Sequence, residues 1–183
     1  MRDPITQSIY NDLKKGIELT LKSDCPISAL SLIFCGIDVL ANLGRPASSA
    51  SVNASDFILW AERFLKLPGK VAVTGEEWYS ARCAVLHTLG VESRRTRSGT
   101  ARKVAFVLGG HPPVRFNPAI DKTLILVDIR ALAKSFFGGI DLFLVGAFAS
   151  SEKRKIVEER LKGLLISLPG RREEAPGTQN REF

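Results

Sequence analysis

The chain has 183 residues, of which 45% are hydrophobic and 25% are charged, and its formal net charge is +7. This length and composition suit one soluble domain with a real core rather than two domains. Cys25, Cys35 and Cys83 have no C-x-x-C spacing, which argues against a disulfide framework and against a zinc site, so we expect reduced thiols and no metal or cofactor. The basic charge is compatible with a polyanion such as nucleic acid as partner.

The sequence indicates a cytoplasmic protein. Its first residues lack the apolar stretch of a signal peptide. The two longest apolar runs, 27–43 and 124–149, are interrupted by charged residues, namely Asp38 in the first and Asp128, Arg130, Lys134 and Asp141 in the second. We therefore expect no membrane span.

Apolar periodicity predicts three helices in the first part of the chain. The first covers 5–21. The second covers 26–43, with Ser23 or Asp24 as a cap and Gly44 at its end, and it is apolar on more than one face, as expected for a central helix. A loop over 46–53 leads to the third helix, which starts near Ser55 or Asp56 and stops before Pro68.

A fourth helix is predicted over 74–90, with both of its ends marked. Thr74 and Glu77 have the spacing of a capping box, and Gly90 can take the left-handed conformation that ends a helix. This helix carries Arg82 and His87 among mostly apolar or small residues, which makes the pair look buried.

The second half of the chain begins with a basic segment, 92–103. Two β-like runs follow, 104–108 and 123–127, and we expect them to form a small antiparallel hairpin. Helices are predicted over 129–148 and from Ser150 or Ser151 onwards, followed by a disordered tail over 169–183. The fold class is therefore mainly α, a bundle of five to six helices with a β-hairpin insertion near 104–127, and one domain spans 1–168.

Arg82 and His87 are the candidate catalytic residues. They point about 140° apart around a helix, so they flank a groove rather than stack on one another. A histidine can act as acid or base near neutral pH, and the planar fork of an arginine suits a phosphate. The alternative interpretation is a core histidine, with Arg82 paired to an acid such as Asp38 or Glu77.

Residues 82–87, Arg-Cys-Ala-Val-Leu-His, resemble the R-x4-6-H motif of the HEPN superfamily. The resemblance implies a HEPN-like helical bundle that forms a homodimer, with Arg82 and His87 in a composite site at the interface. It further implies a metal-independent endoribonuclease in a toxin, defence or RNA-processing role. Such proteins occur in prokaryotic toxin–antitoxin pairs, and a nucleotidyltransferase-type antitoxin is then a candidate partner.

Three residues are candidates for supporting roles: Asp38, Tyr79 and Cys83. Asp38 lies in an apolar helix, so its carboxylate needs a partner; it either orients Arg82 or His87 or forms a structural salt bridge. Tyr79 lies one turn before Arg82, where it contacts a phosphate or belongs to the core or dimer interface. Active relatives often have a polar residue directly after the arginine, so Cys83 favours the alternative function, a non-catalytic HEPN-like interaction or RNA-binding module.

The basic segment is a candidate RNA-binding surface. Clustered cations anchor phosphates without reading base sequence. The alternative is a solvated loop, and His111 is expected to be a surface loop residue. The candidate RNA-binding residues are Arg94, Arg95, Arg97, Arg102 and Lys103.

Overall fold

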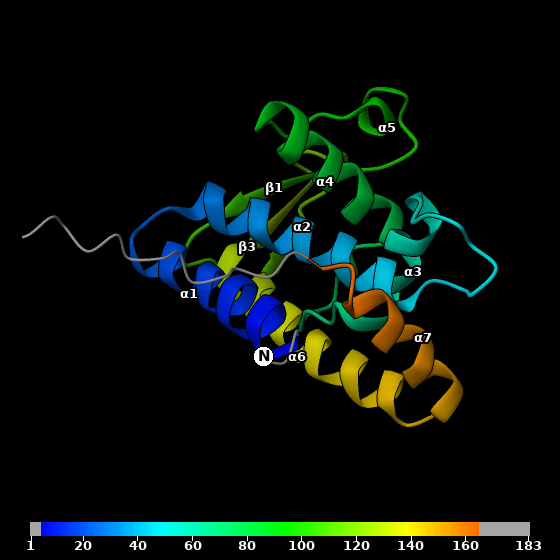
Figure 1. Ribbon diagram of the computed structural model, residues 1–183. Helices are drawn as coiled ribbons and strands as arrows, with labels where there is room; N and C mark the ends of the chain where they lie inside the picture. The colour runs from blue at the N-terminus through cyan, green and yellow to red at the C-terminus, as the bar shows by residue number, and fades with distance from the viewer. Residues whose placement is uncertain (1–4, 165–183) are drawn as a thin grey trace, which may run out of the picture.

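Helix α2 (Pro26–Gly44) runs through the middle of the computed structural model, which describes residues 5–164 (Figure 1). Its residues Ile33, Phe34 and Ile37 are fully buried. A helix that is apolar on several faces needs partners around it. It accordingly packs against η1 (Ile5–Lys14), α1 (Lys15–Lys22), α3 (Ala54–Phe64), α4 (Gly75–Thr88), α6 (Ile129–Phe148) and α7 (Ser151–Leu161).

The prediction of a mainly helical protein with a small sheet is confirmed, although several helix ends differ from expectation. The first expected helix is a π-helical stretch, η1, that continues directly into α1. The cap position of α2 is occupied by Cys25, which makes no side-chain cap hydrogen bond, rather than by Ser23 or Asp24 as predicted, and Asp24 adopts a left-handed backbone conformation. Helix α3 is capped by Asn53, whose side chain accepts from the backbone of Ser55 and Asp56. The expected tail, 169–183, lies outside the described residues.

Helix α4 (Gly75–Thr88) is capped by Thr74 as predicted and ends two residues before the predicted end at Gly90. Thr74 Oγ1 accepts the N–H of Glu77, and Glu77 accepts the N–H of Thr74, which closes the capping box. The left-handed residue at the other end is Leu89 (φ 51°), not Gly90. Leu89 N donates to Val85 O, the bond of the αL capping motif, and Gly90 N donates to Ala84 O. The turn therefore places a leucine where glycine is usual.

The predicted antiparallel hairpin is wrong. β1 (Lys103–Val107) pairs with β3 (Leu124–Asp128) in parallel, with Val104 opposite Ile125. The short β2 (Val114–Arg115) adds to the other edge of β3 in antiparallel orientation, giving the order β1-β3-β2. The physical reason is the long connection 108–123, since a chain of that length can return to the starting end of the sheet as a parallel pairing requires.

Strand β3 leads straight into α6, and Asp128 links the two. Its carboxylate accepts from the N–H of Ala131 in the first turn of α6 and from the N–H of Gly110. The sheet is thereby fixed to the bundle, and α4 packs over β1 on its way past the sheet (Figure 1).

Two of the described helices, α2 and α6, are long and apolar enough to cross a membrane by length and composition alone. Half of the most apolar 18-residue stretch of α2 is buried inside this fold. For the corresponding stretch of α6 the buried share is 39%. Ile33 and Phe136 are completely buried on the two helices. Core packing thus accounts for half of this stretch in α2 and for a smaller share in α6.

Candidate functional site

Arg82 of α4 forms an ion pair with Asp38 of α2. Nε and Nη2 of the guanidinium donate to the same carboxylate oxygen, Oδ2, at 3.0 and 2.8 Å. The two side chains are 23% and 29% exposed, so the pair lies at the surface of the helix contact rather than deep in the core. Asp38 thus contacts Arg82, one of the two roles expected for it, and no contact with His87 is found among the described residues.

The pairing leaves part of the guanidinium available. Asp38 occupies the edge formed by Nε and Nη2, and Nη1 donates no hydrogen bond to any described residue. Burial by itself lowers the pKa of Arg82, but the hydrogen bonds and charge of Asp38, together with Cys83, outweigh it and raise the pKa. The guanidinium therefore keeps its charge beside Asp38 and Cys83.

Tyr79 and Cys83 lie beside the ion pair on the same helix. Burial raises the pKa of the Tyr79 hydroxyl, and the neighbouring Cys83 thiol adds to this effect. The ring of Tyr79 packs edge-on against Phe57, with centroids 5.6 Å apart. The guanidinium carbon of Arg95 lies 5.0 Å from the centroid of the Tyr79 ring. Tyr79 is consequently fixed next to Arg82.

His87 is exposed, so the prediction of a buried histidine is wrong. It follows Tyr79 and Cys83 along one line of α4, one turn beyond Cys83, and Arg82 points to a different side of the helix. Among the nearest residues in the sequence, only Ala84 and Val85 are buried. The imidazole is therefore free to meet a ligand or a second chain.

The basic segment is largely neutralised by acids of α4 and its surroundings. Arg102 binds Glu77 through Nε–Oε1 at 2.5 Å and Nη2–Oε2 at 3.1 Å. Arg95 pairs with Glu76, and Lys103 Nζ lies 2.6 Å from Glu92 Oε1. These three cations therefore have structural partners that the sequence alone did not assign to them.

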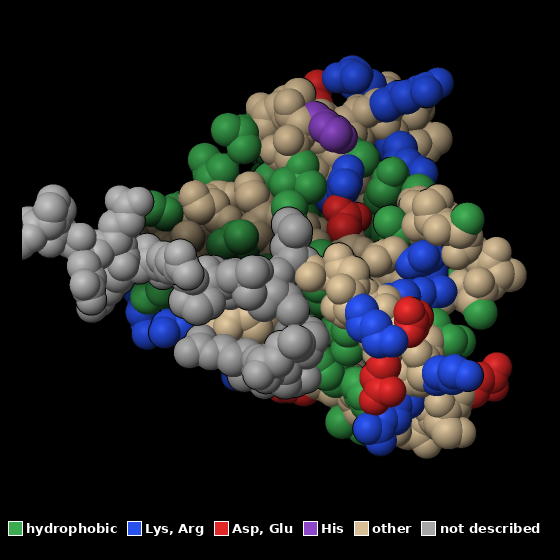
Figure 2. Space-filling view, in the orientation of Figure 1, with side chains coloured by type: hydrophobic (Ala, Val, Ile, Leu, Met, Phe, Trp, Pro, Cys, Tyr) green, Lys and Arg blue, Asp and Glu red, His purple; other side chains and the backbone are tan. Residues whose placement is uncertain are grey.

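Arg94 and Arg97 remain as exposed cations of the short helix α5 (Arg94–Arg97). No ion pair to either is found within residues 5–164. Helix α5 is attached to α4 by a buried hydrogen bond of 2.6 Å between the hydroxyls of Ser80 and Ser93. Figure 2 shows Lys and Arg side chains gathered over α5 and an exposed histidine over α4.

An exposed apolar patch surrounds the end of α4 that carries His87. It consists of four side chains that are all more than 40% exposed and that line one shallow depression: Ile27, Leu89, Val91 and Leu108. Large contiguous apolar patches on soluble proteins mark interaction surfaces. These four side chains lie at the end of α4 that carries His87.

Comparison of the chain with protein-family models, with curated proteins and with solved structures finds no match. No cluster of three or more His, Cys, Asp or Glu side chains that could hold a metal ion occurs in the part of the chain that the structure describes.

Cys35 belongs to the site but was missed by the sequence analysis. Cys35 lies one turn before Asp38 on α2, and its side chain is exposed. Partial desolvation by the surrounding protein raises the pKa of its thiol, and the charge of Asp38 raises it further. The i, i+3 spacing of Cys35 and Asp38 was the available signal.

Proposed function

We propose that this protein is a HEPN-like, metal-independent endoribonuclease that acts as a homodimer. The observation that carries the proposal is the guanidinium of Arg82, held by Asp38, on the same helix as His87, which is exposed and has no ion pair or hydrogen bond within residues 5–164. Cleavage of RNA by its own 2′-hydroxyl needs a group that moves a proton and a cation that stabilises the pentacovalent phosphate. His87 and Arg82 supply these two functions.

The geometry of a single helix explains why two chains are required. Arg82 and His87 point about 140° apart, so one chain cannot direct both at the same phosphate. A two-fold axis next to α4 brings Arg82 of one chain toward His87 of the other. The apolar patch around Leu89 lies at this end of α4 and supports such an interface.

RNA is held in this proposal by the free cations of α5. Arg94 and Arg97 are exposed and contribute charge without reading bases. In keeping with the R-x4-6-H resemblance, the protein acts in the cytoplasm in a toxin, defence or RNA-processing role, and a nucleotidyltransferase-type protein is the antitoxin partner we propose.

The second candidate function is a non-catalytic dimeric module that binds RNA or another chain. The Arg82–Asp38 ion pair favours this function, because the pair can serve only to hold α4 against α2. Cys83 favours it too, because its thiol lies against Tyr79 and cannot replace the polar side chain typical of active relatives.

Incubation of the purified protein with end-labelled single-stranded RNA in excess chelator separates the two functions. The proposal predicts fragments with 2′,3′-cyclic phosphate ends, since the attacking oxygen is the substrate's own. RNA that is bound but stays intact at every protein concentration supports the non-catalytic module instead.

A further inference from the structure

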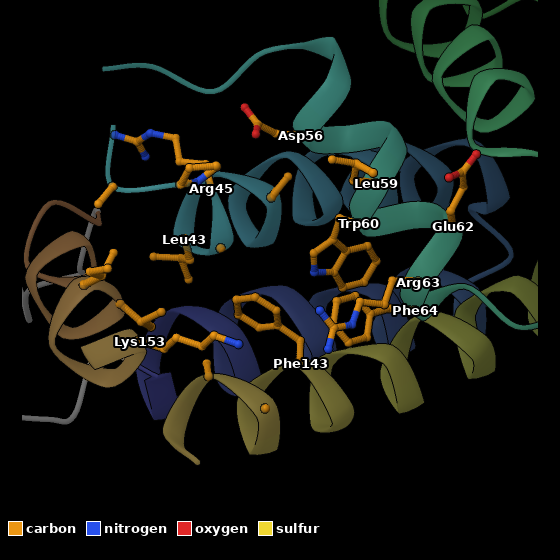
Figure 3. Close-up of a pocket in the computed structure, with 18 of the residues that line it drawn as sticks. Leu43, Arg45, Asp56, Leu59, Trp60, Glu62, Arg63, Phe64, Phe143 and Lys153 are labelled. Atoms are coloured by element: carbon orange, nitrogen blue, oxygen red, sulfur yellow. The ribbon is translucent and has the colours of Figure 1, made fainter. Parts of the chain in front are cut away.

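A hollow of about 750 Å³ lies between α3, α6, α7 and the C-terminal end of α2 (Figure 3). Its volume falls in the range of small-molecule sites in proteins. Leu59, Trp60 and Phe143 give it apolar walls, with a few charged groups at the rim. Arg82 and His87 do not line it, so the hollow is separate from the proposed nuclease site.

Trp60 provides a hydrogen-bond donor inside this hollow. The residue is 4% exposed, and within the described residues its Nε1 is the only buried side-chain nitrogen or oxygen without a hydrogen-bond partner. Buried tryptophan N–H groups usually have partners, and an unpaired one costs about 1–3 kcal/mol. Figure 3 shows the indole nitrogen turned toward the side of the hollow where Leu43 and Phe143 lie.

The indole ring is held in this direction by its neighbours. Its centroid lies 5.1 Å from that of Phe64 and 5.9 Å from that of Phe136. Gly139 of α6 lies close to the ring, since a Cβ there would come within 3.2 Å of the Trp60 ring and 3.0 Å of Phe64 O. The donor is thus built into the wall rather than carried on a mobile side chain.

Two cations at the rim have no acidic partner. Arg63 and Lys153 line the hollow and form no ion pair within residues 5–164. The guanidinium carbon of Arg63 lies 5.2 Å from the centroid of the Phe64 ring. In Figure 3 both side chains extend toward Phe143, from α3 and α7 respectively. A third cation, Arg45, is already bonded to backbone carbonyls, including that of Asn42 at 2.8 Å.

Three acidic side chains also line the hollow: Asp56, Glu62 and Glu152. Asp56 Oδ2 accepts the N–H of Asn53 at 2.9 Å as part of the α3 capping box. The carboxylate of Glu62 is directed away from Phe143 in Figure 3. Glu152 lies in the first turn of α7, where the helix dipole favours a negative charge. The Phe143 side of the hollow therefore presents an N–H donor and two unpaired cations.

We propose that the hollow binds a small amphipathic carboxylate. Its apolar body lies against Leu59, Trp60 and Phe143, and its carboxylate accepts the Trp60 N–H and pairs with Lys153 and Arg63. The ligand thereby supplies the acceptor that Trp60 lacks. This function is independent of RNA cleavage.

Isothermal titration of the full chain with decanoate, and with decanol as a neutral analogue of the same length, tests the proposal. We expect saturable 1:1 binding of decanoate and at least tenfold weaker binding of decanol. Trp60→Phe keeps the aromatic ring and removes the N–H, so it should weaken decanoate binding about tenfold, the usual effect of losing a hydrogen bond to a charged group.

Lys153→Gln is the second variant. Lys153 is exposed, so this substitution should not disturb folding. It should weaken decanoate but leave decanol unchanged, whereas Lys155→Gln, an exposed lysine of α7 outside the hollow, should affect neither. Absence of saturable decanoate binding to the native chain overturns the proposal. Equal affinity for decanol, or an unchanged affinity in Lys153→Gln, overturns the assignment of a carboxylate ligand.

Discussion

Glu77 and Arg102 form an ion pair joined at two points, and the same carboxylate closes the capping box on Thr74. Glu77 is buried and Arg102 is partly exposed. The guanidinium of Arg102 also donates to Ala72 O at 3.1 Å. Glu77 therefore connects the start of α4 to its cap residue Thr74 and to Arg102. Through Arg102 it also connects α4 to the loop at Ala72 and to the segment that enters β1.

Glu77→Ala should lower the free energy of unfolding by about 2 kcal/mol, because it removes the capping box and leaves Arg102 without its acid. Glu76 is the matched control, since it is one residue away, exposed, and paired only with the partly exposed Arg95. Glu76→Ala should cost less than about 1 kcal/mol. Urea denaturation measures both, and equal losses would show that Glu77 has no special role.

Leu89→Gly should stabilise the monomer by about 1 kcal/mol and weaken self-association. Glycine adopts the left-handed conformation of this position without the Cβ penalty that leucine pays. The same change removes a side chain that is 66% exposed in the apolar patch. Thermal unfolding measures the first effect, and sedimentation velocity measures the second.

The control for this variant is Leu19→Ala, which removes an equally apolar side chain, 52% exposed, from α1. It should leave the association constant unchanged. A Leu89→Gly chain that associates as strongly as the native one would show that the dimer contact is not at this patch.

The double variant Arg94→Ala, Arg97→Ala should flatten the salt dependence of RNA binding. Each lost contact to a single-strand phosphate reduces the slope of log K against log salt by about 0.7, so the pair reduces it by about 1.4. Lys15→Ala, Lys22→Ala on α1 changes the net charge equally and should leave the slope alone. Fluorescence anisotropy with a labelled oligonucleotide at several salt concentrations gives the slopes, and equal slopes in all three proteins would exclude α5 as the RNA contact.

Asp38→Ala should reduce kcat for RNA cleavage more than it changes KM, because Asp38 positions Arg82 without touching the substrate. Asp38→Asn keeps an oxygen that accepts from Arg82 and should recover part of the activity. The ion pair is partly exposed, so the free energy of unfolding should change by no more than about 1 kcal/mol in either variant. Native cleavage rates in Asp38→Ala would assign Asp38 a purely structural role.

The helices could be predicted from the sequence because their signals are local. Apolar periodicity identified α2 and α6, and the Thr74–Glu77 spacing predicted the start of α4. The sheet could not be predicted in the same way, since the parallel pairing of β1 with β3 depends on where the connection 108–123 travels. The R-x4-6-H resemblance and the function drawn from it remain proposals.

The sequence also could not predict which residues far apart in the chain contact one another. Asp38 was one of two acids proposed for Arg82, and only the packing of α2 against α4 selects it over Glu77. The basic segment looked unopposed because Glu76 and Glu77, which pair with Arg95 and Arg102, lie 19 and 25 residues earlier in the chain. His87 seemed buried because several of its neighbours in the sequence are apolar, yet only Ala84 and Val85 among the nearest ones are buried.

The most direct test of the proposed catalysis uses the two histidines of the chain, His87 on α4 and His111 in the loop after β1, both of which are exposed. The rate of RNA cleavage in chelator is measured for the native protein, His87→Ala and His111→Ala. Loss of a general acid or base should slow His87→Ala by roughly 10²–10⁴-fold, while His111→Ala cleaves at the native rate. Cleavage that survives His87→Ala at the native rate, or a native protein that cleaves no RNA, would contradict the account.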